Sequence, residues 1–558
     1  MLKQTKQLIL IFFCLLSTLS CSTETSNNST SETLLETPFL WEAANLYFLM
    51  TDRFQNGDPS NDINFNRTQN PDVLRGFEGG DLKGITQKIQ EGYFTDLGVN
   101  AIWMTPIVEQ IHGGLDSNGN TSYGFHGYWT KDWTALDPNF GTESDLHELV
   151  TVAHENGIRI VLDAVLNHTG PTTPNDPTWE SSWVRTETPC TYESYDLTVS
   201  CNLSGLPDIK TESEIEVSLP SELVNKWKNE GRYDKEISEL DAYFLKTGYP
   251  KLPKYYIIKW LTDYISEFGI DGYRVDTVKH TEENVWSEFN VACEDAFQQW
   301  KSNHPADVLD NNSFYLVGEA YDYSIKSGQS FIFPGGVIAN YFQNGFHSLI
   351  NFDFQKTSLL SYEELFTTND WYLHRDLNDY GTLNFLSSHD DISPFDRNRS
   401  KTYQTGTKLL LAPGTSQIFY GDESARTLNA NGASGDAALR SLMNWEEIDS
   451  NTETQKLLVH WQKLGRFRIH HPSIGAGKHS KIQANPYVFK RTFTRGAYQD
   501  KVVIGIDFPI GNKNIPVSGV FKDGRVLTDA YSGIEVTVTN GIASINTSYT
   551  IVLLELKK

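Results

Sequence analysis

Three carboxylates stand at the ends of short apolar segments of this 558-residue chain: Asp276, Glu319 and Asp390. Arginine and histidine accompany them, and burying so many ionisable groups is costly unless they serve a site. Two carboxyl groups suffice to hydrolyse a glycosidic bond. One protonates the leaving oxygen, and the other attacks the anomeric carbon or activates a water molecule. The residue types therefore predict glycoside chemistry.

The neighbours of two of these carboxylates favour different roles. Arg274 lies two residues before Asp276, so on a strand both side chains face the same way. A guanidinium there would hold Asp276 ionised, as a nucleophile requires. Glu319 follows a glycine at the end of an apolar run. Burial beside other carboxylates would raise the pKa of Glu319, as an acid catalyst requires.

Short apolar segments alternate with amphipathic helical stretches along most of the chain. This order predicts an α/β fold, a (β/α)8 TIM barrel of parallel strands, in which loops at the carboxyl ends of the strands build the site. Strands are predicted at 45–53, 100–107, 159–168, 272–278, 314–320, 383–390 and 417–423, with a weaker pattern at 346–354.

Two regions depart from this alternation. Residues 168–253 are long, irregular and rich in Pro, Ser and charge, which predicts a subdomain inserted after the third strand. Residues 466–558 show alternating strands with Gly and Asp-Gly turns, which predicts a C-terminal antiparallel β-sandwich domain. The barrel itself is then expected over 38–167 and 254–465.

The N-terminus is typical of an export signal. Lys3 and Lys6 precede an apolar run of about nine residues, too short to span a membrane comfortably. Cys21 follows a small residue, as in a bacterial lipoprotein signal, so residues 1–21 are predicted to be a signal of lipoprotein type whose Cys21 becomes the acylated first residue of the mature chain. Ordinary signal cleavage nearby is the alternative. Residues 22–37 are polar and suit a flexible tether.

The net charge bears on which molecules the chain could bind, and the cysteines bear on disulfide formation and metal binding. Lys plus Arg is 46 and Asp plus Glu is 71, a net charge of −25, which disfavours binding to nucleic acid. Cys190 and Cys201 are close in sequence in an exported chain and could form one disulfide. Cys293 lies in a helical pattern and is expected to be a buried free thiol. No cysteine pair has zinc-ligand spacing.

Several motifs resemble the signature regions of the α-amylase family, glycoside hydrolase family 13. The motifs are DAVLNH (163–168), GYRVDTVKH (272–280), GE (318–319) and SSHD (387–390). Supporting motifs are GVNAIWMTPI (98–107), FHGYW (125–129), LPDI (206–209) and IFYGDE (418–423). The resemblance runs from about residue 45 to 445, in the family's order. The segment 206–280 is similar to bacterial periplasmic and secreted α-amylases.

This resemblance implies a role for each matching residue. Asp276 would be the nucleophile, Glu319 the acid/base and Asp390 the transition-state stabiliser. The implied substrate-binding residues are Tyr128, His168, Arg274, Lys279, His280 and His389. Calcium is the implied cofactor, since hard cations need clustered oxygen ligands. One calcium site would use Asn167, Asp208 and the carbonyl of His280, and a second would use Asn56, Asp58, Asn61, Asp62, Gly79 and Asp81.

Two positions depart from the family's pattern. Chloride-activated relatives have Asn before the His of the HD motif, whereas this chain has Ser388, so no chloride activation is expected. The residues after Asp390 also differ from the common Asn-x-x-Arg pattern. Either Arg397 or Arg399 could therefore serve the next subsite.

Four functions are compatible with parts of this pattern. The first is an endo-acting α-1,4-glucan hydrolase, expected to be monomeric and exported to the periplasm or cell surface. The second is a neopullulanase, cyclomaltodextrinase or transglycosylase of the same family. The third is a non-catalytic glucan-binding lipoprotein, which predicts loss of a catalytic carboxylate, yet all three are present. The fourth is a metal-dependent hydrolase, but the histidines lack the spacing of a metal triad.

Overall fold

The computed structural model describes residues 37–117, 120–391 and 393–557. The predicted signal with Cys21 and the tether up to residue 36 lie outside them. Within these ranges, no helix is long and apolar enough to cross a membrane.

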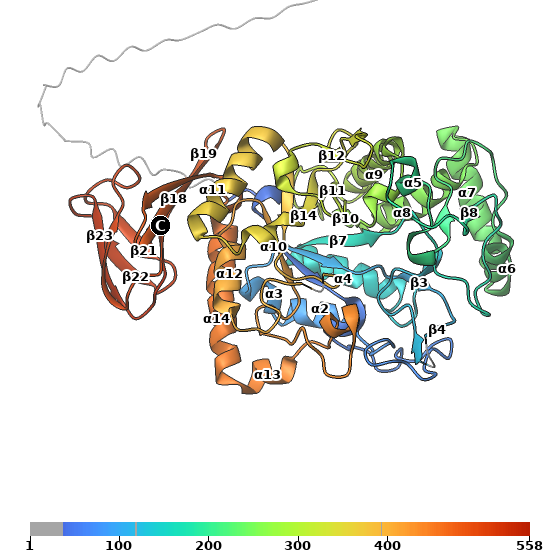
Figure 1. The fold of residues 1–558 in the computed structure, drawn as a ribbon, viewed down its shortest axis with the longest axis horizontal. Helices are drawn as coiled ribbons and strands as arrows, with labels where there is room; N and C mark the ends of the chain where they lie inside the picture. The colour runs from blue at the N-terminus through green and yellow to red at the C-terminus, as the bar shows by residue number, and fades with distance from the viewer. Residues whose placement is uncertain (1–36, 118–119, 392, 558) are drawn as a thin grey trace, which may run out of the picture. The chain divides into compact units, whose positions relative to one another are not determined.

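Eight parallel strands close into a barrel, as the sequence predicts (Figure 1). Around the barrel the order is β1-β16-β15-β14-β11-β10-β7-β2. The barrel is closed by the pairing of the first strand, β1, with the last, β16. The strands are β1 (Asn45–Leu49), β2 (Ala101–Met104), β7 (Arg159–Ala164), β10 (Gly272–Val275), β11 (Tyr315–Gly318), β14 (Ser348–Asn351), β15 (Gly381–Asn384) and β16 (Thr415–Phe419).

Each barrel strand is shorter than the segment that predicted it. The segment 159–168, for example, pairs only as far as Ala164. Val165 and Leu166 remain buried beyond that point, at 2% and 0% exposure. Apolar residues therefore continue past the last strand pairing because the loops at this end of the barrel are themselves buried. Asp276, Glu319 and Asp390 stand on those loops, whereas Asp163 and Arg274 lie near the ends of strands β7 and β10.

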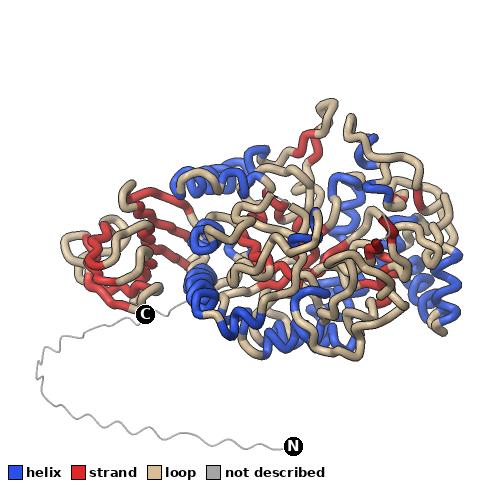
Figure 2. Tube along the Cα trace, turned by 60° about the horizontal axis from the view of Figure 1, so that its bottom comes forward, coloured by secondary structure: helices blue, strands red, loops and turns tan. Residues whose placement is uncertain are grey.

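Helices surround the barrel strands, drawn in blue in Figure 2. Their ends carry recognisable signals. Helix α8 begins with Pro253 and is followed by Gly269 in the left-handed region, at φ 73°. Helices α4 and α11 each begin with a capping box. The main helices are α2 (Leu82–Gln90), α4 (Glu143–Glu155), α8 (Pro253–Phe268), α9 (Glu283–Asn303), α11 (Tyr362–Tyr372), α12 (Thr402–Leu410) and α14 (Thr452–His470).

The segment between β7 and α8 forms the inserted region. It contains β8 (Val184–Arg185), α5 (Asp196–Val199), β9 (Asp208–Ile209), α6 (Ser221–Asn229) and α7 (Tyr233–Thr247). Buried tryptophans attach it to the barrel, because Trp183 and Trp227 of the insertion pack on Trp260 of α8. Large buried aromatic side chains dominate the energetics of such contacts, so these tryptophans hold the inserted region on the barrel.

Short hairpins decorate two further loops, and the sequence did not predict them. Strands β3 (Val108–Gln110) and β6 (Thr130–Leu136) pair between β2 and β7, with β4 (Leu115–Ser117) and β5 (Asn120–Ser122) between them. Strands β12 (Phe331–Ile332) and β13 (Ile338–Ala339) pair between β11 and β14. Such short strands carry too few residues for a period-two pattern.

The C-terminal region is an antiparallel β domain, as predicted. Its six-stranded sheet has the order β17-β18-β19-β24-β21-β22, and β20 pairs with β23. Apolar side chains of both sheets form a second core, which includes Val503, Ile515 and Val552. The strands are β17 (Lys478–Gln483), β18 (Tyr487–Arg495), β19 (Tyr498–Ile506), β20 (Gly511–Pro516), β21 (Val526–Asp529), β22 (Ile534–Thr537), β23 (Ile542–Thr547) and β24 (Val552–Leu556).

Candidate active site

The guanidinium of Arg274 lies at the centre of the strand-end carboxylates. Strand β10 pairs with β7 so that Arg274 stands opposite Asp163. Arg274 Nη1 donates to Asp163 Oδ1 at 2.9 Å and to Asp276 Oδ1 at 2.8 Å. Its Nη2 lies 2.8 Å from Glu319 Oε2. One arginine, 1% exposed, therefore joins three carboxylates from three neighbouring strands.

The environment raises the pKa of these carboxyl groups. Burial raises the pKa of Glu319 to about 7, and Arg274 opposes this only in part. Burial likewise raises the pKa of Asp276 and of Asp163, again against the attraction of Arg274. A carboxylic acid with a pKa of about 7 still holds its proton near neutral pH, so Glu319 can act as an acid.

Asp390 lies on the loop after β15 and has the opposite electrostatics. His389 Nε2 is 2.9 Å from Asp390 Oδ2, and Arg440 Nη2 is 2.6 Å from Asp390 Oδ1. Desolvation would raise the pKa of Asp390, but His389, Arg440 and Arg274 outweigh it and hold the pKa below its usual range. The Asp390 side chain is 51% exposed, so an ionised carboxylate is accessible beside the buried cluster.

Three aromatic residues border the same cluster. Tyr128 donates from its hydroxyl to Asp163 Oδ2 at 2.7 Å, and its ring stacks on that of His389 with centroids 5.4 Å apart. His168 Nε2 lies 3.1 Å from the Tyr128 carbonyl. Burial lowers the pKa of His168 to about 4, so its imidazole is neutral. Among the described residues, neither His389 nitrogen makes a well-aligned hydrogen bond.

A cavity of about 570 Å³ opens beside Glu319. Lys279 and His280, expected on the leaving-group side, both line it. Lys279 Nζ lies 5.1 Å from the ring centre of Tyr192 and 5.0 Å from that of Tyr321. The remaining wall consists of residues from the inserted region, from the loops after β10 and β11, and from the β12 hairpin: Thr198, Leu203, Thr277, Asp322, Phe331, Ile332, Phe333 and Pro334.

The residues of the first expected calcium site lie together. Asn167 Nδ2 donates to Asp208 Oδ1 at 2.7 Å and to the His280 carbonyl at 3.0 Å. A half-turn of the Asn167 amide exchanges its nitrogen for its oxygen, and three oxygens then face one point. Burial raises the pKa of Asp208 to about 8, even with Arg185 Nη1 2.9 Å from its outer oxygen. A buried oxygen set of this kind fits calcium.

The residues of the second expected calcium site also lie together, but two of its carboxylates, Asp58 and Asp81, already have other hydrogen-bond partners. Asn56 Oδ1 and Asn61 Oδ1 are buried and have no hydrogen-bond partner among the described residues. A Cβ added at Gly79 would meet Asp62 Oδ1 at 2.7 Å, so glycine keeps this space open. These orphaned oxygens fit a cation. Asp58 instead contacts Lys83 Nζ at 2.5 Å, and Asp81 accepts three backbone N–H groups, from Gly57, Asp58 and Gly84.

Three residues of the cluster were not singled out as site residues from the sequence. Asp163 and Trp103 meet at 3.1 Å through the indole Nε1, and Arg440 reaches Asp390 from a loop fifty positions later. The two arginines proposed for the next subsite make other contacts. Arg399 Nη1 pairs with Asp422 at 2.8 Å, and Arg397 Nε donates to Asn429 Oδ1 at 2.6 Å.

The model of the α-amylase catalytic domain matches residues 48–466, three quarters of the chain. This chain belongs to the α-amylase family. A periplasmic α-amylase of Escherichia coli (strain K12) is 35% identical over 81% of this chain and 70% of its own length. A cyclomaltodextrin glucanotransferase of Bacillus licheniformis is 27% identical over 89% of this chain and 64% of its own.

Membership of the α-amylase family makes the chain a glycosidase, and a solved structure agrees in fold. An α-amylase of Anoxybacillus superposes with a TM-score of 0.65 at 25% identity, over 93% of this chain and all of that one. The (β/α)8 barrel and the C-terminal β domain expected from the sequence are thereby confirmed. Membership of a family of glycosidases therefore disfavours the hypothesis of a non-catalytic glucan-binding protein.

Proposed function

We propose that this chain hydrolyses α-1,4-glucosidic bonds of starch, glycogen or maltooligosaccharides with retention of anomeric configuration. The observation that carries the proposal is the contact of one guanidinium, Arg274, with both Asp276 and Glu319 at 2.8 Å. An inverting enzyme keeps its two carboxyl groups roughly 6.5–9.5 Å apart to admit a water molecule. Asp276 and Glu319 are instead bridged by the two terminal nitrogens of one guanidinium, which supports the shorter separation of roughly 5–5.5 Å that a retaining enzyme needs.

In the first step Glu319 gives its proton to the glycosidic oxygen while Asp276 attacks the anomeric carbon. The bond from that carbon to the leaving sugar breaks, and an ester to Asp276 forms. In the second step the Glu319 carboxylate takes a proton from water, and the resulting hydroxide displaces Asp276 from the anomeric carbon. Both carboxyl groups return to their starting states.

The other residues of the site hold the reacting sugar. Asp390 stays ionised and stabilises positive charge at the anomeric carbon in the transition state. His389 and His168 provide imidazole nitrogens for sugar hydroxyls, and Tyr128 provides a ring face. Lys279 and His280 line the side where the leaving saccharide lies.

We propose calcium at both oxygen clusters. Bound there, calcium would neutralise buried carboxylates and cross-link loops, and it takes no part in the proton transfers. The cluster of Asn167, Asp208 and the His280 carbonyl would join the inserted region to the barrel. The cluster around Asn56, Asn61 and Asp62 would hold the loop after β1.

The test is the product profile from soluble starch, pullulan and cyclodextrins with calcium present. Wild type should release mixed maltooligosaccharides from starch, and Asp276→Asn should be inactive. The matched control is Asp449→Asn, an exposed carboxylate on α13 (Trp445–Ser450), which should leave activity unchanged. Proton NMR of the first products should show the α-anomer.

Two outcomes would contradict this proposal. Release of the β-anomer first would mean inversion and would remove Asp276 as a nucleophile. Preference for pullulan or cyclodextrins over starch would overturn the substrate while leaving the mechanism intact.

Glucan transfer is the second candidate activity. The cavity of about 570 Å³ beside Glu319 is large enough to hold a saccharide in place of the attacking water. A relative named a cyclomaltodextrin glucanotransferase points the same way. Longer oligosaccharides formed from maltotriose alone would show transfer.

We further propose that the protein is exported and anchored through a lipid on Cys21, as a monomer. A relative named periplasmic supports export. Cys21→Ala should then move the protein from the membrane fraction to the soluble fraction. Unchanged fractionation would reject the anchor.

A further inference from the structure

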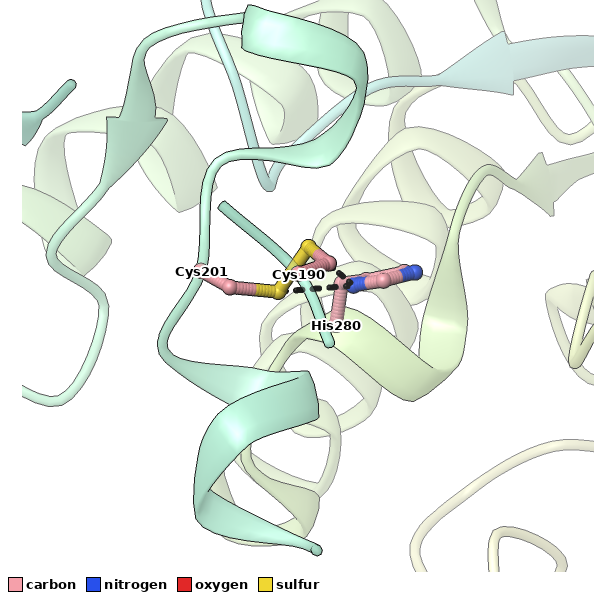
Figure 3. Close-up of side chains that lie close together, drawn as sticks. All are labelled: Cys190, Cys201 and His280. Atoms are coloured by element: carbon pink, nitrogen blue, oxygen red, sulfur yellow. Dashed lines mark hydrogen bonds between the residues drawn. A yellow bond between two sulfur atoms is a disulfide. The ribbon is translucent and has the colours of Figure 1, made fainter. Parts of the chain in front are cut away.

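A disulfide closes one wall of the cavity beside Glu319. Cys190 and Cys201 of the inserted region are bonded, and Pro189 forms a β-bridge with Asn202 directly outside them (Figure 3). The enclosed segment, residues 190–201, contains the short helix α5. Its two ends are therefore held together by a covalent bond and by backbone pairing.

The disulfide packs directly on an active-site residue. Figure 3 shows both sulfur atoms facing the imidazole of His280. The distances from His280 Nδ1 are 3.9 Å to Cys190 Sγ and 3.8 Å to Cys201 Sγ. The same nitrogen lies 2.9 Å from the carbonyl of Thr198, within the enclosed segment. Because His280 follows the Asp276 strand by only a few residues, the segment is tied to the catalytic loop.

The enclosed segment carries Tyr192 into the cavity wall. Tyr192 is 40% exposed and has a backbone φ of 58°, a conformation that a residue with a side chain adopts only when its surroundings hold it. Its ring packs edge-on to that of His280, with centroids 5.7 Å apart, and lies beside the Lys279 ammonium. An exposed aromatic face of this kind suits a sugar ring.

The same segment supports the opposite wall. Tyr195 packs edge-on against Phe333 at 5.0 Å, and Phe333 belongs to the loop between β12 and β13 that lines the cavity. Ile332, the last residue of β12 directly before that loop, is 64% exposed. A change in the 190–201 segment would therefore reach both walls of the cavity.

We propose that the Cys190–Cys201 disulfide is a positioning element for saccharide units on the leaving-group side. It holds Tyr192 and His280 in place before substrate arrives, so that binding there does not have to order the segment. Ordering a free loop on binding weakens affinity, and a pre-formed wall avoids that loss. This inference rests on the proposed glucan hydrolase function.

The test compares two substrates that differ on the leaving-group side. Maltoheptaose can fill the cavity with sugars, whereas 4-nitrophenyl α-maltotrioside presents only a small aryl group there. In Cys190→Ser/Cys201→Ser, KM for maltoheptaose should rise by about tenfold. Its kcat, and both constants for the aryl glycoside, should change by less than about twofold.

Two further variants separate positioning from general destabilisation. Cys293→Ser removes a buried cysteine elsewhere in the protein. It should leave the ratio of the KM for maltoheptaose to the KM for the aryl glycoside unchanged. Tyr192→Ala, with the disulfide intact, should reproduce the rise in KM for maltoheptaose. Combining Tyr192→Ala with the cysteine variant should add little, because both act on one wall.

The outcomes are decisive in each direction. An equal fold-change of KM for both substrates, relative to wild type, in the cysteine variant and in Tyr192→Ala would overturn the proposal, as would parallel losses of kcat on both substrates. If the cysteine variant fails to fold, Tyr192→Ala and wild type reduced in place with dithiothreitol supply the same comparison. Wild type inactive on both substrates would instead contradict the proposed function.

Discussion

Arg440 donates from Nη2 to Asp390 Oδ1 at 2.6 Å and from Nε to the His389 carbonyl at 3.0 Å. It is 5% exposed, and it contacts the backbone and the carboxylate of one loop at once. A charge-assisted contact of this kind fixes the position of Asp390 as well as its charge.

Replacing this arginine should impair catalysis. Arg440→Gln removes the charge-assisted hydrogen bond to Asp390, which is worth roughly 1.5–3 kcal/mol, so kcat/KM should fall by about 10- to 100-fold. Steady-state kinetics on maltoheptaose would measure the loss. Arg495→Gln is the control, because Arg495 is exposed at the end of β18 in the C-terminal domain, and its kcat/KM should stay near that of wild type. Equal losses in both variants would contradict a specific role for Arg440.

The pH dependence of kcat/KM should be bell-shaped. The proposed mechanism requires Asp276 to be ionised and Glu319 to be protonated. Because burial raises the pKa of Asp276, the acidic limb should lie above the ordinary aspartate value of about 3.9. The alkaline limb should lie near pH 7, where Glu319 loses its proton. Initial rates from pH 4 to 9 would locate both limbs.

Glu319→Gln identifies the alkaline limb. Glutamine cannot titrate, so the residual activity should lose that limb, and kcat on maltoheptaose should fall by about 10²–10⁴-fold. A variant that keeps the limb would assign it to another group.

His471 should contribute stability that depends on pH. Burial alone would lower the pKa of His471, but contacts with Asp500 at 2.8 Å and Glu555 at 2.5 Å raise it to about 9. The folded pKa is thus above the unfolded value of about 6.5, so the stabilisation is complete below pH 6.5 and disappears as pH rises through 9. It amounts to at most about 3 kcal/mol.

Thermal unfolding of His471→Gln tests this dependence. The drop in Tm relative to wild type should be several degrees at pH 6 and much smaller at pH 9.5. His304→Gln, a change at an exposed histidine, should show no such difference between the two pH values. A drop that grows with pH would have the wrong sign and would exclude the ion-pair explanation.

Removal of calcium should destabilise the fold. At a calcium concentration of 100 times Kd, each site contributes about 2.7 kcal/mol, so a chelator should lower Tm. Metal analysis should find two calcium ions per chain, and one in either Asp208→Asn or Asp62→Asn. A chelator without effect on Tm and a metal content of zero would reject both sites.

The fold and the central carboxylates could be predicted because their signals are local. Arg274 and Asp276 lie two positions apart on one strand, and parallel strands bring their ends to the same face of a barrel. Each barrel strand combined an apolar run with a polar end, and burial of the following loop explains why the predicted strands were too long.

Contacts across long loops could not be predicted in the same way. Arg440 reaches Asp390 from a loop after a different strand, and no spacing rule connects the two. Asp163 pairs with Arg274 through the register of β7 and β10, which the sequence does not state. Whether Cys190 and Cys201 form a disulfide could not be predicted from the sequence, because it depends on how close the fold brings the two residues.

The closure of the barrel by β1 and β16 also constrains how the chain is made. Leu46 pairs with Gln417 across 371 positions of sequence, so the first strand has no partner on that side until the last one exists. A ribosome adding about 5–20 residues per second needs tens of seconds to supply it. During that interval β1 and the strands after it form an open, apolar sheet edge. The barrel therefore cannot close until residue 419 is available to pair with β1.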